Sequence, residues 1–218
     1  LFLISDFAKD YFKNKLFEEE GKTVALSYLK ERQFKNEIIE KFEIGYSVNL
    51  KDDFSKAAID AGYKINFLEK TGLTIIKESE NIDRFKGRVI FPIRSMSGRI
   101  LGFGGRILGA SKSLAKYINS PESLIYQKSK VLYGIYESKQ SIVKNDNCFL
   151  VEGYTDVIKM HQCGITNVVA SSGTALTENQ IRLINRLTKN ITVVFDGDAA
   201  GSRAALRGID LILEQGMN

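Results

Sequence analysis

Two short acidic stretches, each directly after an apolar run, limit the possible folds of this chain. The runs 148–151 and 191–195 have the length and composition of buried strands in a parallel sheet. The acidic residues that follow them are Glu152 and Asp156 in the first stretch, and Asp196 and Asp198 in the second. Ligands of such sheets lie outside the carboxyl ends of the strands, so we expect these side chains to share one crevice.

Strand-like and helix-like segments alternate through the whole C-terminal part of the chain. The expected strands are 148–151, 167–170 and 191–195, and the expected helices are about 155–163, 177–188 and 201–215. Thr177 is a suitable helix cap, and Glu178 places a negative charge in the first helical turn. This spacing is typical of right-handed βαβ crossovers, so we predict an α/β fold with a Rossmann-like domain over residues 146–218.

The four acidic side chains also predict a cation. Carboxylates gathered at two strand ends repel one another unless a positive charge lies among them. Neither stretch contains a His or Cys, and a set of oxygen ligands favours Mg²⁺. If these residues were only surface turns, repulsion between them would have no stabilising purpose.

The first part of the chain, residues 1–145, predicts a mixed helical and stranded lobe. Residues 1–72 are typical of short helices, and 73–77, 88–94 and 99–106 of strands. Pro92 cannot donate a hydrogen bond to a neighbouring strand, which favours an edge position or a strand end. A further helix is expected at about 133–144.

A basic stretch without any Asp or Glu runs from residue 84 to residue 121. It carries a charge of +8 while the whole chain carries +5, so the rest of the chain carries −3. Its basic residues are Arg84, Lys86, Arg88, Arg94, Arg99, Arg106, Lys112 and Lys116. This pattern is expected of a surface that binds a phosphate backbone, although cations that protect a sheet edge are an alternative.

The end of this stretch, 116–121, is a polar segment with a cation, an aromatic ring and an amide side chain. Such a set can hold a phosphate and stack on a base. It can equally be a capped turn before a helix at Glu122, and composition leaves both interpretations open.

Composition excludes several classes of protein. The 218 residues are 44% hydrophobic and 26% charged, as in ordinary globular proteins. No apolar run is long enough to span a bilayer, and the sequence shows no signal-peptide pattern. Cys148 and Cys163 form no metal-binding pair and fit a reducing, cytoplasmic compartment.

The sequence resembles the catalytic RNA-polymerase core of bacterial DnaG-type DNA primases over nearly its whole length. Three groups of motifs carry this resemblance. They are the basic segments 84–93 and 98–106, the Lys-Tyr-Ile-Asn-Ser-Pro-Glu segment 116–122 with Lys128, and the Toprim-type acidic stretches 152–156 and 196–198. The acidic stretches alone also occur in topoisomerases and nucleases, whereas the basic segments with segment 116–122 are specific to primases.

The resemblance implies a role for each matching residue. Glu152 matches a base or metal-side group, Asp196 and Asp198 match metal ligands, and Asp156 supports them. The residues that match template-binding or nucleotide-binding positions are Arg84, Lys86, Arg88, Arg106, Lys116, Tyr117, Asn119 and Lys128.

The resemblance also implies a reaction and its partners. The expected activity is synthesis of RNA primers from ribonucleoside triphosphates on single-stranded DNA, with Mg²⁺ or, as a substitute, Mn²⁺. The resemblance further places the protein at the replication fork, with the replicative helicase and single-strand-binding protein as partners. No association with a membrane is expected. A zinc module before residue 1, a third acidic cluster and a helicase-binding module after residue 218 are expected outside this chain. A Toprim nuclease and a non-catalytic DNA-binding module are the alternatives.

Overall fold

The computed structural model describes residues 1–78, 80–109, 115–173 and 175–218. It divides into two compact units. The N-terminal unit consists of Leu1–Ile93 and Arg99–Tyr126, and the C-terminal unit of Arg94–Gly98 and Gln127–Asn218. This division groups the helix at 135–145 with the C-terminal unit, and the predicted domain boundary after residue 145 stays a prediction.

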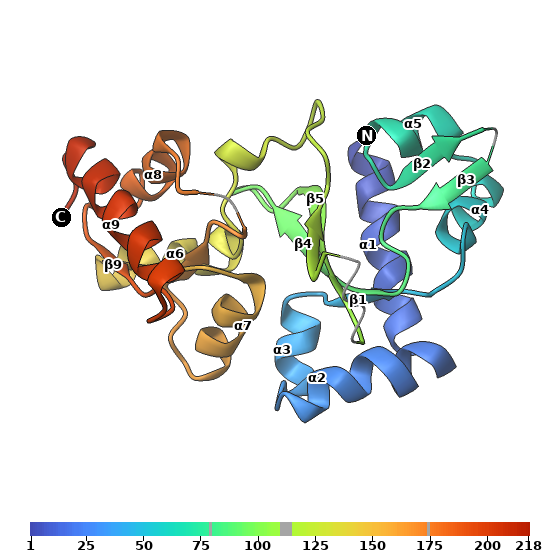
Figure 1. Cartoon of the computed structure of the whole chain (residues 1–218), viewed down its shortest axis with the longest axis horizontal. Helices are drawn as coiled ribbons and strands as arrows, with labels where there is room; N and C mark the ends of the chain where they lie inside the picture. Colours follow the sequence, from blue (N-terminus) through green and yellow to red (C-terminus); the bar gives the residue numbers. More distant parts are fainter. Residues whose placement is uncertain (79, 110–114, 174) are drawn as a thin grey trace. The chain divides into compact units, whose positions relative to one another are not determined.

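Short helices make up most of the first half of the N-terminal unit, as predicted (Figure 1). They are α1 Phe2–Leu16, a π-helix Gly21–Leu26, α2 Ser27–Glu31, α3 Asn36–Lys41, α4 Asp53–Asp60 and α5 Ile65–Lys70. Helix α1 buries Ala8, Phe12 and Leu16, which recur every four residues and therefore share one face.

The strands of this unit form a four-stranded sheet and a separate hairpin. The sheet has the order β1-β4-β5-β6 and the hairpin pairs β2 with β3. The bounds are β1 Gly45–Ser47, β2 Thr74–Lys77, β3 Glu80–Asp83, β4 Arg88–Arg94, β5 Ile100–Ile107 and β6 Tyr117–Asn119.

Two details of this sheet differ from the expectations. Strand β4 lies between two neighbours and is not an edge strand, but β1 pairs only as far as Ile90, so Pro92 lies beyond that pairing. The segment 116–121 contains β6, because Tyr117 and Asn119 pair with Arg106 and Gly104 of β5. No helix begins at Glu122 among the described residues.

The core of the N-terminal unit joins α1 to the sheet. The rings of Phe12 and Phe103 meet edge to face with their centroids 5.7 Å apart. A Cβ atom at Gly45 would lie 2.6 Å from the Cβ atom of Phe12, so only glycine lets β1 approach α1 this closely. Burying a phenylalanine ring contributes about 1.5–3 kcal/mol, and this contact therefore fixes α1 firmly on β1 and β5.

A parallel sheet forms the centre of the C-terminal unit, as predicted. Its order is β8-β7-β9, and β7 pairs in parallel with both neighbours. The strands are β7 Cys148–Val151, β8 Val168–Ala170 and β9 Ile191–Val193, and the helices are α6 Ile135–Asn145, α7 Tyr154–Gln162, α8 Glu178–Asn185 and α9 Ala199–Glu214. A single 3₁₀ turn, Lys128–Lys130, precedes α6.

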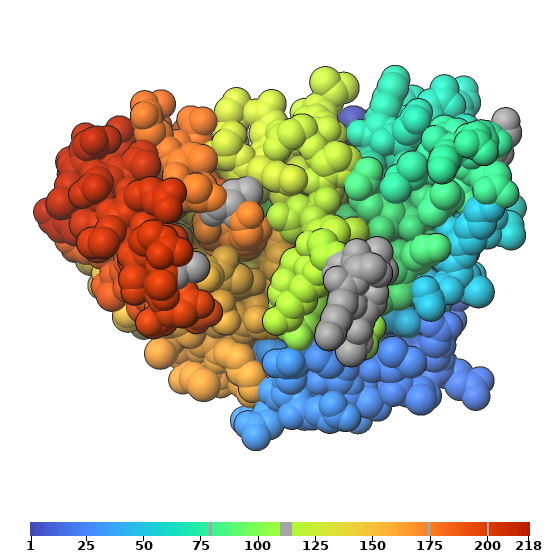
Figure 2. Space-filling view, viewed as in Figure 1, coloured from blue at the N-terminus to red at the C-terminus, as the bar shows by residue number. Residues whose placement is uncertain are grey.

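Helices cover both faces of this sheet. Leu150 and Val169 share a core with Ile181 and Ile184 of α8, while Val157 of α7 lies near Val168 on the opposite face. Residues of α9, drawn in red, lie at the surface of the unit (Figure 2).

Two further expectations concern the cysteines and the membrane. Cys148, which is buried, and Cys163, which is exposed, are both free thiols, and burial raises the pKa of the Cys148 thiol to about 12. Among the described residues, no helix is sufficiently long and apolar to span a bilayer.

Candidate functional site

Glu152 and Asp196 are in contact where the parallel strands β7 and β9 end. Glu152 directly follows β7, and its Oε1 accepts a hydrogen bond from the backbone N–H of Asp196 at 2.9 Å. The two strands are parallel neighbours, so their carboxyl ends reach the same edge of the sheet. Gly201 makes room for this contact, because a Cβ atom there would lie 2.2 Å from the Asp196 carbonyl oxygen and 2.9 Å from Glu152 Oε1.

The other two acidic residues of the predicted site, Asp156 and Asp198, lie at the beginning of α7 and α9. The carboxylate of Asp156 accepts a hydrogen bond from the Gly153 N–H at 2.9 Å in the first turn of α7. The carboxylate of Asp198 accepts one from the Gly201 N–H at 2.8 Å at the beginning of α9. Negative side chains are favourable at both positions because helix N-termini carry a partial positive charge.

Electrostatic repulsion links these carboxylates. Partial burial of its carboxyl group, together with the nearby charges of Asp196 and Glu152, raises the pKa of Asp156 above its usual value. A cation among the three would lower that repulsion, and the oxygen atoms offered here are the ligands that hard divalent cations prefer. The residues therefore fit such an ion in their chemistry. Within the described ranges, however, no group of three His, Cys, Asp or Glu side chains is already gathered as a metal cluster.

Two arginines of the basic stretch donate hydrogen bonds to backbone carbonyl groups of the N-terminal unit. Arg88 is only 5% exposed, and its Nη1 donates to the carbonyl oxygens of Gly105, Ala115 and Lys116 at 3.1–3.4 Å. Arg84 is half-buried, and its Nε donates to the Gly72 carbonyl at 2.6 Å. Burial lowers the pKa of both guanidinium groups. These two side chains hold backbone segments together.

Arg106 is part of a cation–aromatic cluster. Its guanidinium lies 4.9 Å from the ring centre of Tyr28 and 5.3 Å from that of Tyr117, and its Nη1 donates to the Tyr117 hydroxyl at 2.8 Å. Arg32 lies 4.9 Å from the Tyr28 ring. Desolvation by burial raises the pKa of Tyr28. The sequence gives no signal for Tyr28, because nothing in its helix links it to a strand 78 residues later.

The other predicted binding residues are more accessible. Lys86 and Lys116 are exposed, Tyr117 and Asn119 are half-buried on β6, and Lys128 is half-buried on the 3₁₀ turn. Lys112, which completes the basic stretch, lies outside the described residues. The binding role of every one of these residues stays a prediction.

Two known protein families match consecutive segments of this chain. The family described as DNA primase catalytic core, N-terminal domain, matches residues 11–139, and a Toprim-like family matches residues 149–218. The chain therefore belongs to the DNA primase catalytic-core family, as its motifs predict.

Curated relatives of this chain are DNA primases. The DNA primase of Halalkalibacterium halodurans is 42% identical over 99% of this chain, and that of Deinococcus radiodurans is 41% identical over 98%. The chain covers 36% and 37% of these two proteins, so it spans about a third of their length.

Solved primase structures share the fold. The RNA polymerase domain of Mycobacterium tuberculosis primase DnaG superimposes with a TM-score of 0.89 at 36% identity, covering 96% of this chain and 70% of that one. The Aquifex aeolicus primase, with its zinc-binding and RNA polymerase domains, gives a TM-score of 0.91 at 33% identity, covering 99% and 52%. A DnaG primase catalytic domain bound to single-stranded DNA gives 0.88 at 36% identity, covering 97% and 66%.

Proposed function

We propose that this chain is the catalytic part of a primase that synthesises short RNA primers on single-stranded DNA. The observation that supports this most strongly is that one chain matches both the primase core family and the Toprim-like family over consecutive segments. The bond formed joins the 3′-hydroxyl oxygen of one ribonucleotide to the α-phosphate of the next, and pyrophosphate leaves.

Asp196 and Asp198 are the proposed metal ligands, with Asp156 and Glu152 beside them. A bound Mg²⁺, or Mn²⁺ in its place, would supply Lewis-acid chemistry at the reacting phosphate. Glu152 accepts a hydrogen bond from the Asp196 backbone and so holds that residue at the strand end. Its proposed role is that of a base or a metal-side group.

The exposed cations of the basic stretch are proposed to hold the template. The side chains of Lys86 and Lys116 are exposed to solvent, and Tyr117 and Asn119 both lie on β6. Contacts of this kind are made to phosphates and carry no sequence information, so affinity for single-stranded DNA should fall steeply as salt increases. The half-buried Arg84 and the buried Arg88 and Arg106 are proposed to support this surface through their hydrogen bonds to neighbouring groups.

The partners and location follow from this role. Ribonucleoside triphosphates are the proposed substrates, and a replicative helicase and single-strand-binding protein the proposed partners. The proposed location is the cytoplasm, at the replication fork.

Incorporation of labelled ribonucleotides on single-stranded DNA tests the proposal. The reaction is run with Mg²⁺ or Mn²⁺, using this chain and its Asp196→Asn variant, with the full-length Halalkalibacterium halodurans primase as a positive reference. We expect Asp196→Asn to abolish RNA synthesis and to leave DNA affinity within a few-fold, because the carboxylate binds metal and not template. Normal primer yield from the variant would contradict the metal assignment. Cleavage of DNA without nucleotides would instead support a nuclease.

A further inference from the structure

The turn that carries Lys128 depends on another part of the C-terminal unit for its position. The turn Lys128–Lys130 is a single 3₁₀ turn, and the Lys130 N–H donates to the Gln127 carbonyl at 2.9 Å. So short a turn is not stable alone, because few of its backbone groups are paired within it.

Side chains at the start of α8 bind the backbone of this turn. Gln180 Nε2 donates to the carbonyl oxygens of Lys128 at 3.2 Å and Val131 at 2.8 Å. The Thr177 hydroxyl donates to the Ser129 carbonyl at 2.7 Å. Three carbonyl groups within four consecutive residues are therefore held by two side chains of one helix start.

The same two residues form the cap of α8, which fixes their own orientation. The Thr177 hydroxyl accepts from the Gln180 N–H at 3.3 Å, and Gln180 Oε1 accepts from the Thr177 N–H at 3.1 Å. Gln180 is fully buried, with 0% exposure, and its amide uses its oxygen and its nitrogen in these contacts. A capping glutamine needs only its oxygen, so the two bonds from Nε2 serve the turn and not the helix.

We propose that Gln180 and Thr177 are positioning residues that hold Lys128 where it binds a phosphate group of the nucleotide or the template. This inference rests on the proposed function, because that function gives Lys128 its ligand. The two residues touch the backbone of the turn and not the ligand, so they act through Lys128.

Gln180→Met is the most direct test, because methionine has a similar length and keeps the net charge while losing every amide hydrogen bond. Binding of a fluorescent ribonucleoside triphosphate and of a labelled single-stranded oligonucleotide is measured for the unsubstituted chain, Lys128→Ala, Gln180→Met and the double variant. We expect each single change to weaken the same ligand about tenfold, and the double variant to be no weaker than Lys128→Ala, because both act on one contact.

Salt dependence separates a lost phosphate contact from general destabilisation. If the ligand is the oligonucleotide, both Lys128→Ala and Gln180→Met should reduce the slope of log affinity against log salt by about 0.7, the value for one single-strand phosphate. Ser138→Ala is the matched control, because Ser138 is equally buried and donates to the Val168 carbonyl at 2.7 Å without touching the turn. It should change neither affinity nor slope.

If Gln180→Met does not fold, two variants of Thr177 test the same positioning role. Thr177→Val removes the hydroxyl that reaches the Ser129 carbonyl, and Thr177→Ser keeps it. We expect weaker binding with valine and normal binding with serine. Normal affinity in Gln180→Met or Thr177→Val, or additive losses in the double variant, would overturn this positioning role but leave the proposed function intact. An unsubstituted chain that binds neither ligand would overturn the proposed function, and this inference with it.

Discussion

Gly201 shows how one residue without a side chain shapes the candidate metal site. The Glu152 carboxylate and the Asp196 carbonyl both lie in the space that a Cβ atom at this position would occupy. For Gly208, on the same helix, the nearest described atom outside its own helical turns is Leu176 Cδ2, at 3.6 Å from such a Cβ atom. The two glycines therefore differ in what surrounds them and not in the helix that carries them.

We expect opposite effects from an added methyl group at these glycines. Gly201→Ala should lower the free energy of unfolding by about 1–3 kcal/mol, because the Asp196 backbone has to move. Gly208→Ala should raise it by about 0.5–1 kcal/mol, because alanine is the better helix former and the added methyl meets only ordinary contact. Urea unfolding of both variants measures these changes. Equal stability of the two would show that Glu152 and Asp196 do not lie as close to Gly201 as described.

Residue roles were harder to predict from the sequence than residue positions. The carboxylates at the ends of β7 and β9 could be predicted, because apolar runs followed by acidic residues have a simple geometric consequence. The burial of Arg88 could not be predicted, because an arginine in a strand is usually on the surface. The cost of burying its charge is compensated by hydrogen bonds to the carbonyl groups of Gly105, Ala115 and Lys116, which come together only in the folded chain.

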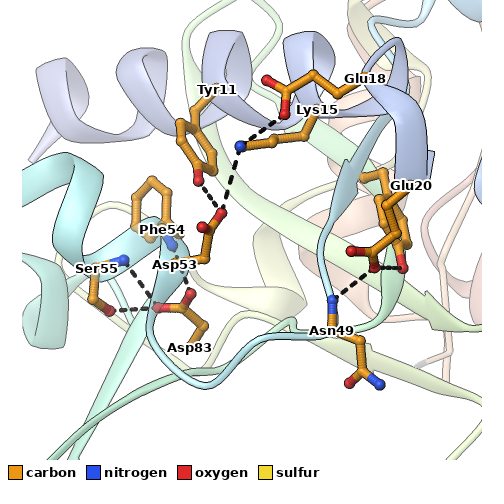
Figure 3. Close-up of polar contacts among 10 residues, drawn as sticks. Tyr11, Lys15, Glu18, Glu20, Asn49, Asp53, Phe54, Ser55 and Asp83 are labelled. Carbon is orange, nitrogen blue, oxygen red and sulfur yellow. Dashed lines mark hydrogen bonds and ion pairs between the residues drawn. The ribbon is translucent and has the colours of Figure 1, made fainter. Parts of the chain in front are cut away.

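At the scale of single elements, Asp83 stabilises the beginning of α4 from a neighbouring strand. Its carboxylate accepts hydrogen bonds from the N–H groups of Phe54 at 2.7 Å and Ser55 at 3.0 Å, and from the Ser55 hydroxyl (Figure 3). Asp83 thus takes the place of a helix cap that the preceding residue does not supply. Burial, partly offset by these hydrogen bonds, raises the pKa of Asp83 above its usual value.

Because its pKa is raised, Asp83 contributes more to the free energy of unfolding at low pH than at high pH. The folded protein binds this proton more tightly than the unfolded chain, so the contribution is fully present below the unfolded pKa and is lost as pH rises through the folded pKa. We therefore expect the stability difference between the unsubstituted chain and Asp83→Asn to shrink from pH 4 towards pH 7. Chemical unfolding at several pH values measures it. A difference that grows with pH would contradict the raised pKa.

Elements with a strong sequence pattern were predicted, and those that depend on distant partners were not. The apolar strands β4 and β7 and the capped helix α8 follow from local periodicity and capping. Strand β3 has the polar sequence Glu-Asn-Ile-Asp and is extended because it pairs with β2. Composition gives no strand signal in segment 116–121 for the same reason, since only pairing with β5 makes Tyr117–Asn119 a strand.

Across the whole molecule, positive and negative charges are concentrated in different parts of the chain. The basic excess belongs to the stretch 84–121, whereas the four carboxylates of the candidate metal site lie outside that stretch. This separation suits the proposed function, because carboxylates placed among the cations would repel template phosphates. Within the basic stretch, the buried arginines maintain the structure, and the exposed lysines Lys86 and Lys116 carry charge to solvent.

Neutralising the exposed lysines should therefore reduce DNA binding without loss of the fold. For Lys86→Gln with Lys116→Gln, we expect the slope of log affinity for single-stranded DNA against log salt to fall by about 1.4, the value for two phosphate contacts. Lys56→Gln with Lys64→Gln removes two exposed charges from the same unit outside the basic stretch and should leave the slope unchanged. Arg88→Gln should instead lower the unfolding temperature, because three carbonyl groups lose their donor. Fluorescence anisotropy over a salt series and thermal unfolding measure both effects. An equal change of slope in the two lysine pairs would mean that net charge, and not this stretch, governs DNA binding.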